Sequence, residues 1–184
     1  MQDKYLGDSY DLVKRYWADS LRDIAPLFAH PRFVPAELRV RYSSLTTITI
    51  LEPATERPCG ILLDPDTGIP RPSESRSAAS AKHATLPFIL RVQEELHPEY
   101  MICFDQSVHR SATLPKGEQR QLKMSWLMEH GLASFYYVSH APFLFMAPQI
   151  SMLQSIRDRL ITLGIPESRF ELSVACGRQR TVDQ

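Results

Sequence analysis

The sequence lacks the features that mark secreted, zinc-binding and membrane-spanning proteins. Its three cysteines, Cys59, Cys103 and Cys176, make an odd number without a close pair, which argues against a CxxC zinc site and a disulfide framework. The longest apolar stretch, 133–148, is interrupted by polar residues and a proline and is too short to cross a bilayer. The first residues, MQDKYLGDSYD, lack the basic and apolar segments of a signal peptide. These absences predict a cytoplasmic protein.

An excess charge of either sign is also missing. Lys plus Arg number 21 and Asp plus Glu number 21, so no overall field draws the chain to nucleic acid or an anionic membrane. Contact with nucleic acid would need a local patch, and no membrane contact is expected. A protein partner or a homo-oligomer remains open. The patterns GxxxxGK[ST], GxGxxG, HExxH and GxSxG are all absent, which argues against several common nucleotide-binding and hydrolase sites.

What the sequence does contain is enough apolar material for a packed core. With 184 residues and 43% hydrophobic residues, the chain has the size and composition of one globular domain. We expect a single domain over residues 1–175 and a disordered tail over 176–184. Residues 69–85 are rich in Ser, Ala and Pro and are expected to form a mobile loop inside the domain.

Strand and helix patterns alternate along the chain. Strands are expected at residues 4–7, 46–51, 59–63, 100–104, 133–138 and 143–146. Helices are expected around residues 12–24, 36–45, 85–96, 118–130 and 150–163. Two hairpins are possible, one joining the second and third strands and one joining the last two. The alternation predicts an α/β fold, a three-layer sandwich with a mostly parallel or mixed central sheet.

Polar residues directly follow four of the expected strands. They include Asp8, Asp64, Asp66, Asp105 and His140. Ligands of open α/β sheets bind beyond the carboxyl ends of the strands, so these side chains are candidates for a shared site. Clustered carboxylates repel one another unless a cation joins them, and their oxygens suit Mg²⁺ or Mn²⁺. We therefore expect the four aspartates to be metal ligands, with His140 as a general acid or phosphate contact.

Each of these residues also has a purely structural interpretation. Asp8 begins a helix, and Asp11 three positions later completes something close to a capping box. Residues 64–68, DPDTG, have the chemistry of a type I turn. His140 can belong to a four-residue turn. Asp105 follows a buried strand, where a charge is costly unless it is exposed or paired, but it can also cap a loop.

Three resemblances to known families bear on these residues. The strand followed by DPDT resembles the first motif of haloacid-dehalogenase phosphatases, although Gly68 after Thr67 departs from it and the final acidic pair is missing. The order of strand-end carboxylates resembles PIN and NYN metal-dependent nucleases, which would implicate Asp8 and Asp105 but whose paired final aspartates are absent. The segments GDSYDLVK, LDPDTG and FDQS are similar to an uncharacterised bacterial family, and this implies no activity.

The sequence therefore supports two hypotheses. The first is a divalent-metal-dependent phosphodiester hydrolase, in particular a nuclease, with Lys14 or Arg110 as a charge stabiliser. The alternative is a non-catalytic binding or assembly module of a bacterial multi-protein system, in which the acidic residues are caps and turns. The enzyme hypothesis requires at least two of the carboxylates within reach of one ion.

Overall fold

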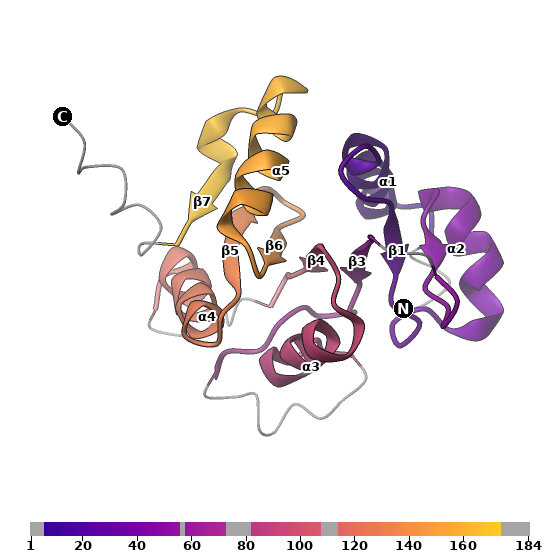
Figure 1. Ribbon diagram of the computed structural model, residues 1–184, viewed down its shortest axis with the longest axis horizontal. Helices are drawn as coiled ribbons and strands as arrows, with labels where there is room; N and C mark the ends of the chain where they lie inside the picture. Colours follow the sequence, from indigo (N-terminus) through magenta and orange to yellow (C-terminus); the bar gives the residue numbers. More distant parts are fainter. Residues whose placement is uncertain (1–5, 56–57, 73–81, 108–113, 174–184) are drawn as a thin grey trace.

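A mixed seven-stranded sheet forms the centre of the molecule, which is a computed structural model describing residues 6–55, 58–72, 82–107 and 114–173 (Figure 1). The strand order is β2-β1-β3-β4-β6-β5-β7. The strands are β1 (Leu27–Ala29), β2 (Thr49–Ile50), β3 (Gly60–Leu63), β4 (Tyr100–Phe104), β5 (Ala133–Tyr137), β6 (Phe143–Ala147) and β7 (Phe170–Leu172). Strands β2, β1, β3 and β4 are parallel. β6 runs antiparallel to both β4 and β5, so β5 points the same way as β4, and β7 runs antiparallel to β5.

Helices cover both faces of this sheet (Figure 1). One face carries α1 (Ser9–Leu21), α2 (Arg39–Thr46) and α5 (Ile150–Thr162), and the other carries α3 (Leu86–Leu96) and α4 (Lys116–Glu129). Single 3₁₀ turns, η2 (Ala36–Leu38) and η4 (Glu167–Arg169), precede α2 and β7. The predicted three-layer α/β sandwich with a mixed sheet is confirmed.

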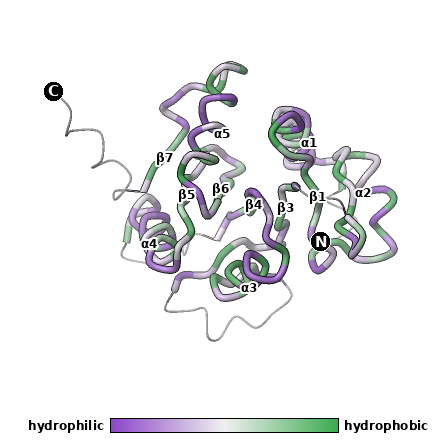
Figure 2. The backbone as a smooth tube through the Cα atoms, in the orientation of Figure 1, coloured by the Kyte–Doolittle hydropathy of each residue, from purple (hydrophilic) through white to green (hydrophobic). Residues whose placement is uncertain are grey.

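The core is divided between the two faces because strand side chains alternate in direction. On β4, Ile102 packs with Trp17 and Ile156 on one side, whereas Met101 packs with Leu127 on the other. The apolar residues accordingly lie on the central strands and on the helix faces turned toward them (Figure 2). The predicted inward stripe of the last helix is confirmed, since its three members are buried: Leu153, Ile156 and Leu160.

Two expectations for the N-terminal half are wrong. Residues 46–51 and 59–63 do not form a hairpin, because β1 lies between β2 and β3 and all three are parallel. β1 is only three residues long and follows Pro26, which is why it reads as loop in the sequence. The strand expected at 4–7 lies partly outside the described residues, and Leu6 and Gly7 form a turn.

The buried face of α1 is narrower than its apolar pattern predicts. Trp17 and Leu21 are buried, but Leu12 is 66% exposed and Tyr16 is 38% exposed. Positions 17 and 21 are one turn apart and share the inward face, whereas Leu12 lies outside it. Lys14 and Asp11 are buried on this helix instead. The helix therefore turns two charged side chains toward the interior.

The ends of the predicted mobile loop are anchored to the domain. Ile69 and Ala84 are buried, and Gly68 forms a β-bridge with His83. Residues 73–81 and the predicted tail at 176–184 lie outside the described residues.

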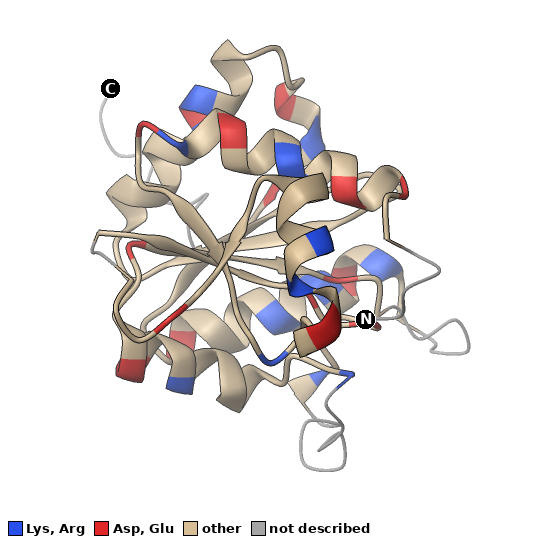
Figure 3. Cartoon of the chain, turned by 90° about the vertical axis from the view of Figure 1, so that its right-hand side faces the viewer, with Lys and Arg blue, Asp and Glu red and all other residues tan. Residues whose placement is uncertain are grey.

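Acidic and basic residues are interspersed along the helices (Figure 3). No helix in the described part is long and apolar enough to cross a membrane.

Candidate functional site

The carboxyl ends of β3, β4 and β5 meet at one edge of the sheet, as the strand directions require. Asp64 follows β3, Asp105 follows β4, and His140 lies in the loop between β5 and β6. Asp8 reaches the same region from the N-terminus of α1 rather than from a strand. The edge thus collects the predicted residues, but their side chains divide between two separate groups.

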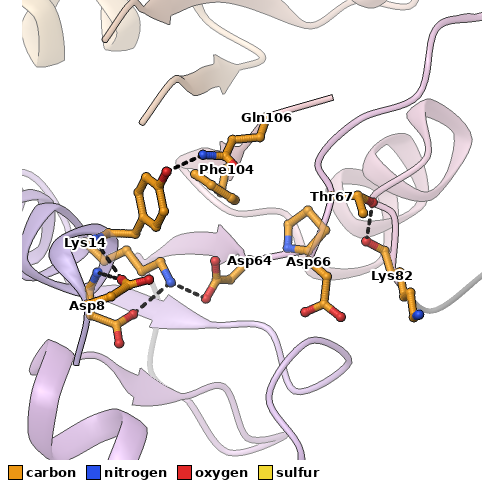
Figure 4. Close-up of a pocket in the computed structure, with 11 residues that line it drawn as sticks. Asp8, Lys14, Asp64, Asp66, Thr67, Lys82, Phe104 and Gln106 are labelled. Atoms are coloured by element: carbon orange, nitrogen blue, oxygen red, sulfur yellow. Dashed lines mark hydrogen bonds and ion pairs between the residues drawn. The ribbon is translucent and has the colours of Figure 1, made fainter. Parts of the chain in front are cut away.

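The first group lines a pocket of about 490 Å³, within the usual range of small-molecule sites (Figure 4). The lining residues are Asp8, Tyr10, Asp11, Lys14, Asp64, Pro65, Asp66, Thr67, Lys82, Phe104 and Gln106. In Figure 4, Asp64 and Asp66 lie between Asp8 on one side and Lys82 on the other. Four carboxylates and two lysines give the lining a formal charge of −2. Asp105 is not part of it.

A buried ion triad, Asp11–Lys14–Asp64, forms the floor of the pocket. Lys14 Nζ lies 2.9 Å from Asp11 Oδ1 and 2.6 Å from Asp64 Oδ2, and all three residues are buried. Burial alone would lower the pKa of Lys14, but the charges of Asp64 and Asp11 and the hydrogen bonds to them outweigh it and raise the pKa. Lys14 therefore stays an ammonium ion, and it lies where a cation bridging the two carboxylates would lie.

The burial of this triad raises the pKa of Asp64 and of its neighbour Tyr42. Burial raises the pKa of Asp64 against the attraction of Lys14. Burial, followed by the charges of Asp64 and Asp11 and by a hydrogen-bonding contact with Asp64, raises the pKa of Tyr42 well above its usual value. That contact of the Tyr42 hydroxyl falls outside normal hydrogen-bond geometry. Lys14 Nζ lies 5.7 Å from the centre of its ring.

Asp8 is the N-cap of α1, as the structural interpretation predicted. Its Oδ1 accepts hydrogen bonds from the backbone N–H groups of Tyr10 at 2.8 Å and Asp11 at 3.3 Å. Asp11 Oδ2 in turn accepts from Gly7 N at 2.7 Å. This is a capping box displaced by one residue, since the reciprocal bond reaches the residue before the cap.

Aromatic and amide side chains form one rim of the pocket. Gln106 Nε2 donates to the Tyr10 hydroxyl at 2.5 Å. The Tyr10 ring lies 5.3 Å from Phe104 and is stacked with His140, with centroids 5.8 Å apart and planes at 30°. His140 therefore contacts a lining residue without itself lining the pocket. Its ring is exposed, in the bend between β5 and β6.

The opposite rim follows β3. Asp66 is exposed, and the chain bends at Asp66 and Thr67 without the hydrogen-bonded turn that the sequence predicts. The segment bonds across the pocket edge instead: Thr67 N and Oγ1 donate to the Lys82 carbonyl, and Ala84 N donates to the Gly68 carbonyl. This pairing anchors the DPDTG segment at the edge of the pocket.

The second group is centred on Asp105 and is closed to solvent. Asp105 Oδ1 accepts from Ile69 N at 2.8 Å and Ser107 N at 3.1 Å, and Oδ2 accepts from Lys123 Nζ and the Tyr136 hydroxyl, both at 2.7 Å. Both partners of the Lys123 ion pair are buried. Burial, and then the charge of Asp105, raises the pKa of Tyr136 well above its usual value. Asp105 is thus fully occupied in joining the loop after β3 to α4 and β5.

The predicted metal site does not fit these contacts as a single cluster. Among the described residues, no three His, Cys, Asp or Glu side chains are grouped so that they could hold a metal ion. Asp8 caps a helix, and Asp105 lies in the closed network. Of the four predicted ligands, Asp8, Asp64 and Asp66 line the same pocket. Arg110 lies outside the described residues.

Sequence reasoning missed several residues that build the two groups. The sequence predicts Asp11 only as a cap and assigns no role to Lys123, Tyr136 or Gln106. The available signal was local: Lys14 and Lys123 occupy positions on helices where their neighbours are apolar and buried. A lysine on an inward helix face predicts a buried carboxylate partner, but it does not say which one.

Comparison with known proteins finds no matching family model, no matching curated protein and no matching solved structure.

Proposed function

We propose that the chain is a binding module, whose pocket at the carboxyl ends of β3 and β4 recognises a polar group of another molecule. The observation that supports this best is Lys14, which lies between two carboxylates at the pocket floor. A fixed ammonium ion supplies the charge compensation that a metal would supply in an enzyme of the expected kind. Lys14 and the predicted metal ligands Asp8, Asp64 and Asp66 then shape and charge a recognition site.

This proposal extends to the setting of the protein. A recognition module with mixed surface charge suits a cytoplasmic assembly in which the ligand is a small molecule or part of a partner protein. Its affinity would come from the pocket, since acidic and basic residues are interspersed along the described helices (Figure 3).

The test is whether divalent ions raise the Tm of the protein or support cleavage of nucleic acid. Wild-type protein is melted with and without Mg²⁺ or Mn²⁺, each also with inorganic phosphate, because a ligand at 100 times its Kd adds about 2.7 kcal/mol of stability. The proposal expects no metal-dependent rise in Tm and no metal-dependent cleavage of single- or double-stranded DNA or RNA. A rise in Tm together with cleavage would overturn it.

A second candidate function is the divalent-metal-dependent phosphodiester hydrolase, a nuclease, expected from the sequence. The observation that favours it is that Asp8, Asp64 and Asp66 line one pocket. Mg²⁺ in proteins often uses only one or two carboxylates, completing its shell with water and phosphate oxygens. In that case Lys14 would stabilise charge, and His140 would protonate or contact the phosphate.

Asp66 separates the two candidates because it lines the pocket and is exposed. A thermal melt of the variant checks that its fold is intact. The hydrolase expects Asp66→Asn to abolish metal-dependent cleavage of nucleic acid. The matched control is Asp158→Asn, whose side chain is 67% exposed on α5. If wild type cleaves and Asp66→Asn cleaves equally well, Asp66 is not a ligand.

A further inference from the structure

We draw no further inference here: the strongest candidate, the acidic pocket at the carboxyl ends of β3 and β4, belongs to the site already described, and each of its charged side chains interacts with other groups of the chain.

Discussion

The molecule places two aspartate–lysine pairs side by side at the same sheet edge and uses them differently. Asp64 after β3 pairs with Lys14 at the floor of a pocket, and Asp105 after β4 pairs with Lys123 inside the closed core. Asp105 is bound by donors from three other segments of the chain, while Asp64 shares its lysine with a second carboxylate. The closed pair joins segments together, whereas the open pair leaves charge facing a cavity. Strand-end position alone does not distinguish the two roles.

The largest expected effect comes from removing the closed carboxylate. Asp105→Ala leaves Lys123 buried without its ion-pair partner and removes the acceptor of two backbone N–H groups. We expect a loss of about 5 kcal/mol in the free energy of unfolding, measured by urea denaturation. Asp64→Ala should cost about half as much, because Lys14 keeps Asp11 as a partner. Equal losses would mean that the two pairs are equivalent. If Asp105→Ala does not fold, Asp105→Asn takes its place, and it should also lose more stability than Asp64→Ala.

Removing the lysine of the open pair should produce a loss that depends on pH. Lys14→Met leaves Asp11 and Asp64 facing each other in a buried site, at a cost of about 3–4 kcal/mol at pH 7. Without the ammonium ion, the pKa of Asp64, already raised by burial, should rise further. A raised folded-state pKa gives stability that is present at low pH and lost as pH rises through it, so the variant should recover toward pH 5.

The matched change in the closed pair, Lys123→Met, should recover less in acid. Asp105 would retain as donors the Tyr136 hydroxyl, two backbone N–H groups and the Ser107 hydroxyl. Both variants are measured by urea denaturation between pH 5 and 8. Asp64 shares its lysine with Asp11, whereas Asp105 has several other hydrogen-bond donors. Parallel pH profiles for the two lysine variants would contradict this distinction.

Gly68 connects the two regions and offers a more local test. Its φ is +99°, and a Cβ there would clash with the Asp105 carboxylate and with the backbone of Asp105 and Gln106. Gly131 has a φ of +80° but open space around its added Cβ. Gly131→Ala should therefore cost only the backbone strain of about 1–2 kcal/mol, and Gly68→Ala should cost about 3 kcal/mol. Similar losses in thermal or urea unfolding would show that the Asp105 side chain and the backbone of residues 105 and 106 shift freely to accommodate a methyl group.

The parts of this architecture that the sequence predicts are those encoded locally. The strand Tyr100–Phe104 was predicted without error because five consecutive apolar residues precede a charge. The helix at 86–96 was predicted with its cap, since Thr85 accepts from Phe88 N. β1 was missed because three residues beside a proline carry too short a pattern.

The site was predictable in position but not in its pairings. The strand-end rule places Asp64 and Asp105 at one edge, which the sheet confirms. What it cannot supply is that Asp105 meets Lys123, 18 residues away, and that Asp64 meets Lys14, 50 residues away. Those partners depend on how α1 and α4 dock onto opposite faces of the sheet, and docking is set by the whole core. The same carboxylate pattern is therefore compatible with a metal site and with two lysine pairs.

The smallest expected effects distinguish two buried tyrosines, one beside each carboxylate. Tyr136 donates a 2.7 Å hydrogen bond to Asp105, so Tyr136→Phe should cost about 1.5–3 kcal/mol at pH 7. The contact of the Tyr42 hydroxyl with Asp64 falls outside normal hydrogen-bond geometry, so Tyr42→Phe should change stability by less than about 1 kcal/mol.

At alkaline pH the two tyrosines should instead behave alike. Burial and a nearby carboxylate raise the pKa of both above the ordinary 10.0, so each contributes stability that is full below pH 10 and lost as pH rises further. In wild type each such group steepens the alkaline decline by up to about 1.4 kcal/mol per pH unit. Either phenylalanine variant should flatten that decline between pH 10 and 11 in urea unfolding. A Tyr42→Phe variant that loses as much stability at pH 7 as Tyr136→Phe would mean that Tyr42 is hydrogen-bonded to Asp64 in solution. The hydrogen-bonding groups of the pocket floor would then be as fully paired as those around Asp105.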